Sequence, residues 1–337
     1  MEGILIPMRP LIRAFLAPII VTLLGLLLVG AWGGPRAFGI AALLIVLEVT
    51  LSFDNAVVNA KILRQQSEIW QQRFLTWGIL ISVVLTRAFL PIAIVALSTG
   101  TSIWLISQIA WNDPKQYAEL LHGSHYIIAS FGGIFLTLVG LRYFFNKEKE
   151  VHWIHSVEHR LAQWGAIESV VIGLALLTLF VIALLLPEHR TEILFSGLAG
   201  VLIFVVLQGI ISAFGAETMQ VHHTGFVLFA YLNILDAAFS LDSVVGAFAL
   251  STQLPVIIVG LGVGAYFVRS LTVYMVRHQV LEKLAYIEHG AHWAILGLAG
   301  AMLASMFIDL PEPITGLIGL TLVSFAYISS IRTVQKQ

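Results

Sequence analysis

The sequence contains no cysteine and few charged residues. Without cysteine there are no disulfides, no thiol redox chemistry and no thiolate ligands, so any bound metal must use oxygen or imidazole ligands. The 18 basic and 19 acidic residues give a net charge of −1, which leaves no basic surface for a nucleic-acid partner. Neither GxxxxGKS nor GxxxxGKT occurs, so we expect no ATPase within the chain.

Apolar residues dominate instead. Hydrophobic residues make up 58% of the chain, charged residues 11%, and the mean hydropathy is +0.93. These values predict a polytopic membrane protein in contact with the lipid bilayer. The first apolar stretch, from about Leu11 to Val29, is too long for a signal-peptide core and lacks a small-x-small cleavage pattern, so we expect a retained helix.

About 20 apolar residues in a helix cross a bilayer core, and ten such segments fit the chain. We therefore predict an all-α membrane protein, one domain over residues 1–337, with about ten transmembrane helices. The predicted spans are 11–30, 37–60, 74–98, 124–145, 168–186, 192–213, 225–250, 255–276, 291–308 and 312–331.

The basic residues between these spans are unevenly divided, with thirteen on one side and three on the other. The positive-inside rule places the richer side and both termini in the cytoplasm, and we expect a bacterial-type inner (plasma) membrane. The longest cytoplasmic connection, 146–165, is predicted to be an amphipathic helix on the membrane, anchored by Trp153 and Trp164. Its three histidines, at 152, 155 and 159, fit a weak metal sensor but are more typical of a solvated helix face.

Two apolar segments carry the same polar pattern 188 residues apart. Ionisable side chains at the bilayer centre cost roughly 2.5–3.5 kcal/mol each, so a duplicated acidic motif predicts function. The first copy has Glu48, Ser52, Asp54 and Asn55, and the second has Asp236, Ser240, Asp242 and Ser243 at identical offsets.

Further landmarks extend the repeat. A glycine precedes Arg87 by nine residues, and another precedes Arg269 by nine. The next spans open with His122-Gly-Ser-His125 and His289-Gly-Ala-His292. Spans two to four therefore correspond to spans seven to nine, with repeat cores at 37–145 and 225–308. The offset of five spans predicts that the copies cross in opposite directions, as in inverted-repeat transporters with a midplane site.

Helical spacing places most of the motif on one stripe. Glu48, Ser52, Asn55 and Asn59 align at 100° per residue, as do Asp236, Ser240 and Ser243. Asp54 and Asp242 lie about 120° away, so the helix is either continuous and widely buried or locally unwound. Because no glycine or proline lies between Glu48 and Asn59, we favour the continuous helix.

Carboxylate, hydroxyl and amide oxygens without sulfur suit Mg²⁺, Ca²⁺ or Mn²⁺, and no organic cofactor is indicated. Intramembrane acids also pair with arginine to fix helix packing, and Arg87 and Arg269 individually fit structural counter-ions better than substrate contacts. The histidine pairs could bind a metal at the mouths of their spans, but helix capping or loop contacts are commoner roles.

The segments around Glu48-x-x-x-Ser52-x-Asp54-Asn55 and Asp236-x-x-x-Ser240-x-Asp242-Ser243 resemble the TerC family of membrane proteins, named for tellurium resistance. That family is similar to the LysE-type inverted-repeat transporters, and members are implicated in manganese efflux and metal homeostasis. The resemblance covers spans two to nine. It implies Mn²⁺ as the cargo, and it implies these metal ligands: Glu48, Asp54, Asn55, Asp236 and Asp242.

Our leading hypothesis is a secondary exporter of a divalent cation, probed by Asp54→Ala and Asp242→Ala. The alternative is a membrane scaffold that binds a metal or a stress-response partner without transport. An intramembrane aspartyl hydrolase is disfavoured because the aspartates lack a GxGD pattern and the duplicated acids exceed a two-acid mechanism, so we expect no enzyme. Glycines at 260, 262 and 264 fit a homo-oligomer as well as internal packing.

Overall fold

The computed structural model describes residues 8–64, 66–146, 149, 151–164, 169–215, 221–308, 310 and 312–334. Within those ranges it does not describe every side chain, and the side chains of Asp242 and Trp164 are among those left out. Every regular element in the described residues is a helix, as the apolar composition predicts.

The helices follow one another with short connections. Their bounds are α1 Met8–Leu51, α2 Phe53–Leu63, α3 Glu68–Leu80, η1 Ile81–Phe89, α4 Leu90–Thr99, α5 Ile103–Asn112, α6 Pro114–Gly123, α7 His125–Phe144, α8 His155–Trp164, α9 Ser169–Leu185, η2 Pro187–His189, α10 Arg190–Gly215, α11 Val221–Leu250, α12 Leu254–Arg277, α13 Val280–Lys283, α14 Ile287–Ala304 and α15 Glu312–Val334. Of these, η1 is a π-helix and η2 a 3₁₀-helix.

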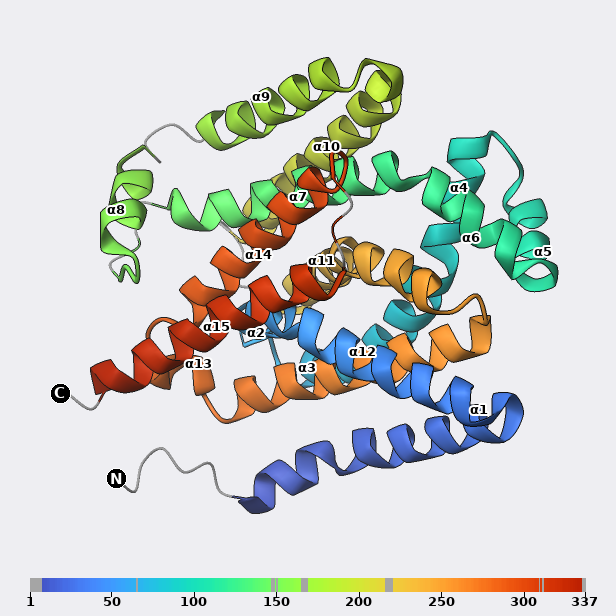
Figure 1. Cartoon of the computed structure of the whole chain (residues 1–337). Helices are drawn as coiled ribbons and strands as arrows, with labels where there is room; N and C mark the ends of the chain where they lie inside the picture. Colours follow the sequence, from blue (N-terminus) through green and yellow to red (C-terminus); the bar gives the residue numbers. More distant parts are fainter. Residues whose placement is uncertain are drawn as a thin grey trace.

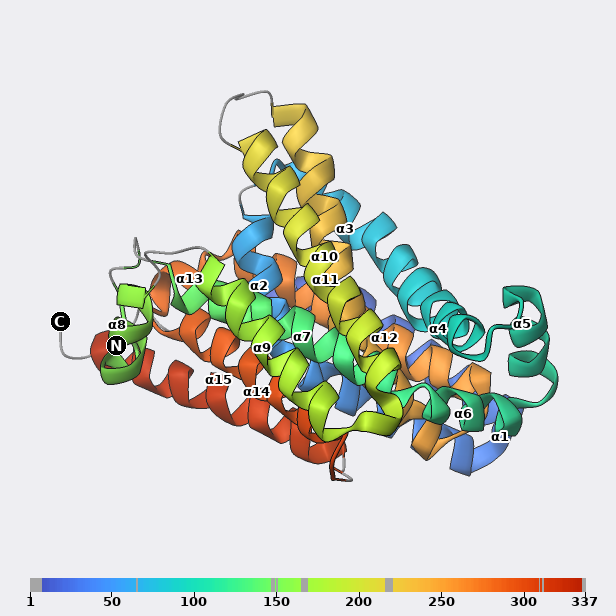
Figure 2. The same ribbon diagram turned by 90° about the horizontal axis from the view of Figure 1, so that it is seen from above.

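Long-range packing defines the bundle. Helix α12 lies along α1, α7 packs against both α10 and α14, and α14 packs against α15. The end of α15 and α8 lie at one end of the molecule in both views, and the start of α1 lies toward that end in Figure 1. Helices α5 and α6 and the turn of α1 lie at the other end (Figures 1 and 2).

Five helical segments of the described chain are long and apolar enough to cross a membrane. They are Ala14–Leu51, Glu68–Thr99, His125–Phe144, Pro187–Ile210 and Leu254–Arg277, and shorter apolar helices cover Ser169–Leu185, Gly225–Ser240 and Leu317–Thr333. Each of the ten predicted spans overlaps a helix. These lengths and compositions are consistent with a membrane protein whose apolar helices contact lipid.

Helix α1 contains the first predicted span and the first part of the second, with a sharp turn between them. Gly34 has φ 74° and ψ −172°, a conformation that is rare for residues with a side chain. The helix reverses there, and Pro35 begins its second half (Figure 1). The break between the segments 11–30 and 37–60 is therefore set by a glycine in the predicted gap.

Candidate functional site

The first acidic motif lies across an interruption between α1 and α2. Ser52 has φ −100° and ψ 14°, so α1 ends at Leu51 and α2 begins at Phe53. The interpretation we favoured from the sequence, a continuous helix from Glu48 to Asn59, is therefore wrong. Ser52 Oγ does not cap α2; it donates a hydrogen bond of 3.1 Å to Glu48 Oε1 one turn earlier. The second motif differs, because the backbone of α11 stays helical throughout it.

Four buried charged side chains join the two motifs, and we call Glu48, Arg87, Asp236 and Arg269 the buried charge network. Arg87 Nη2 donates to Glu48 Oε1, and Arg87 Nη1 lies 3.7 Å from Asp236 Oδ2. Arg269 Nη2 donates to the same Asp236 oxygen at 3.0 Å. Two carboxylates and two guanidinium groups sum to zero charge, which is how charged groups can be retained away from water.

The π-helix η1 brings a serine that sequence reasoning missed into this network. Ser82 Oγ donates to Asp236 Oδ2 at 2.5 Å, and it accepts a hydrogen bond from Arg87 Nη1. Single-turn π segments often occur at functional sites. The sequence offers one signal for Ser82, which is its position five residues before a buried arginine.

Amides extend the network along α2. Asn55 Nδ2 donates to Asp236 Oδ1 at 3.1 Å, and Asn59 Nδ2 donates to Asn55 Oδ1 at 2.8 Å. Of the predicted stripe of Glu48, Ser52, Asn55 and Asn59, Asn55 therefore contacts the second motif directly, and Asn59 supports Asn55.

Gly78, the glycine nine residues before Arg87, leaves room for the side chain of Arg269. A Cβ at Gly78 would lie 2.6 Å from Arg269 Nη1, so any larger residue would displace the guanidinium. The guanidinium also lies over the Phe74 ring, 4.3 Å from its centroid, and donates to Asn233 Oδ1 at 3.4 Å. Asn233 and Phe74 were not predicted as site residues.

Asp54 is turned away from the other acids. The side chain is buried, and its Oδ1 accepts the backbone N–H of Asn55 at 2.9 Å. Its Oδ2 lies 3.9 Å from the position of a Cβ at Gly319 on α15. Asp54, which the helical spacing placed off the stripe, thus lies at the contact between α2 and α15.

The second motif is only partly described. The side chain of Asp242, its second predicted ligand, lies outside the described residues. Ser243 Oγ donates to the Ser240 carbonyl oxygen at 3.0 Å, and Ser240 Oγ is buried without a hydrogen-bond partner in the described chain.

The predicted metal ligands whose side chains the structure describes do not form one cluster. Among the described residues, no three His, Asp or Glu side chains are placed to share an ion. Three acceptor oxygens of predicted site residues are nevertheless buried without a described hydrogen-bond partner: Glu48 Oε2, Asn59 Oδ1 and Ser240 Oγ. Buried polar atoms are normally satisfied, so unpaired oxygens of this kind suit an oxygen-seeking ion or water.

The first histidine pair spans the end of α6 and the start of α7, and the second pair lies at the start of α14. His125 Nε2 is 3.1 Å from the Ser305 carbonyl oxygen at the end of α14, and the His292 ring stacks on Tyr143 at the end of α7, with centroids 3.7 Å apart. The two helices are therefore antiparallel. His122 is exposed, whereas His289 is buried. The contacts of His125 and His292 are with a loop, a ring and backbone, as expected for structural histidines.

Glu158 fastens the 146–165 connection to the bundle, a role that no sequence pattern indicated. Its buried carboxylate accepts hydrogen bonds from His289 Nδ1 at 2.7 Å, Trp293 Nε1 at 3.0 Å, Lys149 Nζ at 2.9 Å and the Trp153 backbone N–H at 3.1 Å. Burial alone would raise the pKa of this carboxyl, but the hydrogen bonds from His289 and Lys149 outweigh it and hold the pKa well below its usual range.

The amphipathic helix predicted over 146–165 is shorter in the described residues, where α8 covers His155–Trp164 and His152 and Trp153 lie before it. His155 and His159 are exposed and stacked, with ring centroids 5.2 Å apart, whereas His152 is half-buried. Trp153 is half-buried, and the other predicted anchor, Trp164, has a side chain outside the described residues.

The described chain is all-helical, and several of its apolar helices are long enough to cross a bilayer. The chain belongs to the family described as protein of unknown function (DUF475), whose model matches residues 53–337. No curated protein and no solved structure is significantly similar to the chain. The matched region begins at the Ser52 interruption and contains both arginines and the second motif.

Proposed function

We propose that the protein is a TerC-like secondary transporter that exports a divalent cation, with Mn²⁺ favoured over Ca²⁺ and Mg²⁺. The observation that carries the proposal is the meeting of both acidic motifs in one buried network. Asn55 bonds to Asp236 across 181 residues of chain, and Arg87 lies between Glu48 and Asp236. The proposal assigns no enzymatic activity and no organic cofactor.

In this proposal the arginines act as internal cations. With Arg87 and Arg269 on the carboxylates, Glu48 and Asp236 are not free to bind cargo. A divalent ion would replace a guanidinium on these oxygens and recruit the unpaired oxygens of Glu48 and Asn59. Asp54 would supply a further carboxylate only after the local structure changes, because its Oδ2 lies beside Gly319 of α15 here. In the proposal, Asp242 is a further ligand, as the sequence predicts.

An inverted repeat of ten spans is part of the same proposal. It is supported by the antiparallel packing of α7 and α14, which carry the matched histidine motifs. The start of α1, the end of α15 and α8 share one end of the molecule (Figure 1). That arrangement is compatible with cytoplasmic termini in a bacterial-type inner membrane.

Proteoliposomes containing a metal-sensitive dye test the proposal. We expect Mn²⁺ flux with the wild type, a loss of at least about tenfold in Glu48→Gln, Asp54→Ala, Asp236→Asn and Asp242→Ala, and unchanged flux in Glu192→Gln, whose acid is exposed on α10. Size-exclusion chromatography must show that each variant is folded. Absence of flux for Mn²⁺, Ca²⁺ and Mg²⁺ in the wild type would refute transport.

The alternative function, a scaffold without transport, is favoured by one observation. The exposed histidines of α8 are presented by a segment that Glu158 holds rigidly against α14. A scaffold requires this segment but not the acids in the bundle. Deletion of 149–164 would then abolish metal or stress-partner binding, while Asp54→Asn would be tolerated.

A further inference from the structure

Two adjoining cavities open at the end of the molecule opposite α8. The first, of about 370 Å³, lies between the second half of α1 and the turn from α11 to α12, and Arg36, Ser251 and Gln253 are among its lining residues. The second, of about 470 Å³, is lined by Trp32, Trp111 and Lys115, among others. Both cavities include Thr252 and Gln253, so they share a wall.

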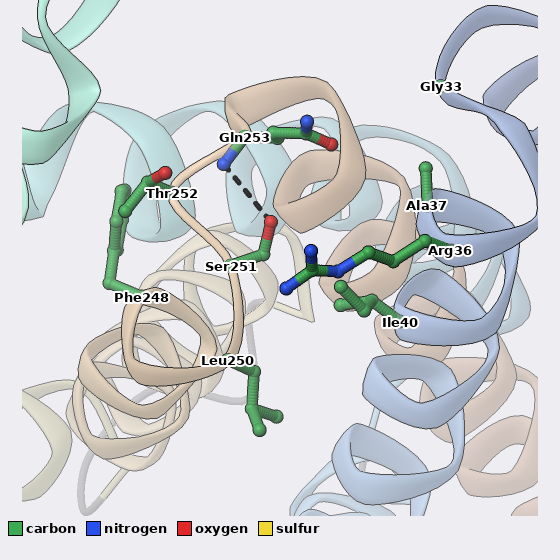
Figure 3. Close-up of a pocket in the computed structure, with 9 residues that line it drawn as sticks. All are labelled: Gly33, Arg36, Ala37, Ile40, Phe248, Leu250, Ser251, Thr252 and Gln253. Carbon is green, nitrogen blue, oxygen red and sulfur yellow. Dashed lines mark hydrogen bonds between the residues drawn. The ribbon is translucent and has the colours of Figure 1, made fainter.

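One basic side chain belongs to each cavity. Arg36 extends from α1 across the first cavity toward the turn at 251–253 (Figure 3). Neither Arg36 nor Lys115 has an ion pair or a hydrogen bond from its side chain within the described residues. The acid of the second cavity, Asp113, accepts the backbone N–H of Gln116 at 3.2 Å as the cap of α6. Arg36 and Lys115 carry two positive charges and Asp113 one negative charge, so the lining of the two cavities has a net positive charge.

Exposed aromatic rings flank the same cavities. Trp32 is 62% exposed and Trp111 is 71% exposed. Trp104, which lies on α5 with Trp111, is 73% exposed. Tryptophan side chains with an apolar body and a polar N–H are typical of the level at which a bilayer meets water. Leu27 and Leu28, about one turn before Trp32, are 65% and 70% exposed, so a lipid-facing apolar surface leads up to the second cavity.

We propose that the two cavities form one binding site for an anionic phospholipid, with its phosphate held between Arg36 and Lys115 and its acyl chains along the exposed surface of α1. Arginine and lysine both bind phosphate, and the excess positive charge favours an anionic over a zwitterionic headgroup. A soluble phosphate would use the two cations but would leave the exposed tryptophans and leucines without a role.

The bound lipid would connect three parts of the fold. It would touch α1, the start of α6 and the turn between α11 and α12, and those last two helices carry Asp236 and Arg269. Occupancy would therefore stabilise the arrangement in which α11 and α12 hold the buried charge network. The site requires only a membrane location and does not depend on transport of a cation.

The test uses the purified full-length protein in mild detergent, with phosphatidylglycerol or phosphatidylcholine of matched acyl chains. We expect phosphatidylglycerol to raise the melting temperature by about 3–5 °C and phosphatidylcholine to raise it by less than about 1 °C. The shift should disappear in R36Q/K115Q and persist in R36K/K115R. It should also persist in Arg190→Gln, a third basic residue of the sparsely charged side, whose Nε bonds to the Ala183 carbonyl oxygen at 3.2 Å.

Three results would overturn the proposal. These are an equal shift with both lipids, a shift retained in R36Q/K115Q, or the same shift with glycerol 1-phosphate, which would identify a soluble phosphate as the ligand. Native mass spectrometry of the wild type gives an independent answer should R36Q/K115Q fail to fold. Preferential retention of phosphatidylglycerol supports the site, and equal retention of phosphatidylcholine contradicts it.

Discussion

Asp236 is the acceptor shared by both arginines, so its removal should unbalance the buried charge network. Its Oδ2 is 3.0 Å from Arg269 Nη2 and 3.7 Å from Arg87 Nη1. Asp236→Asn leaves two guanidinium groups with only Glu48, an uncompensated buried charge that costs about 3–5 kcal/mol. At about 2 °C per kcal/mol, the melting temperature should fall by about 6–10 °C.

A second substitution tests whether charge is the cause. Arg269→Gln combined with Asp236→Asn restores neutrality, so the double variant should be more stable than the sum of the single effects predicts, by about 2 kcal/mol. The measurement is thermal unfolding followed by size-exclusion chromatography. As a control, the partly exposed pair Lys61 and Glu288, 2.7 Å apart, should couple by less than about 1 kcal/mol. Additive losses at Asp236 and Arg269 would refute the reasoning.

Three further substitutions test the packing and hydrogen bonds around the site. Gly264→Ala should destabilise by about 1–3 kcal/mol, because the new Cβ would lie 2.5 Å from Glu48 Cβ, whereas Gly39→Ala meets no atom within 4 Å and should be tolerated in the same melting assay. Ser82→Ala should cost about 1.5–3 kcal/mol through its lost hydrogen bond to a carboxylate, and an unchanged melting temperature would contradict that bond. The pKa of Glu158 is lowered by folding, so its contribution is fully present above the unfolded pKa, about 4.3, and is lost as pH falls below it. Hydrogen-exchange protection factors at 151–164, which are corrected for the intrinsic pH dependence of exchange, should therefore fall below about pH 4 in the wild type, and they should be low at every pH in Glu158→Gln.

The sequence predicted the all-helical class and the apolar segments, because both depend on the local density of apolar residues, but it did not predict α5 and α6. The gap after span one contains Gly34, whose positive φ turns the chain, and the matched arginines lie beside the motif acids. Those features follow from composition, spacing and the need to neutralise charge in an apolar interior. The order of apolar, charged and glycine residues along the chain is enough to predict these features.

The contact partners of individual side chains could not be predicted in the same way. Ser52 has an ordinary helical neighbourhood in sequence, yet it donates to Glu48 and the helix restarts at Phe53. Asp54 faces α15, and Glu158 binds residues 131 and 135 positions away. Such contacts depend on which helices become neighbours, and a single sequence does not contain those distances.

The two halves of the proposed repeat have matching sequence landmarks but different local structures. Around Arg87 the first repeat has a π-helix, and this arginine contacts the acids of both motifs. Around Arg269 the second repeat has a regular α-helix, and this arginine bonds only to Asp236 among the acids described. In inverted-repeat transporters the two halves exchange conformations between inward-open and outward-open states. If the proposed transport holds, the alternate state should have Arg269 bridging both acids and Arg87 bound to Glu48 alone, because equivalent landmarks can adopt equivalent structures.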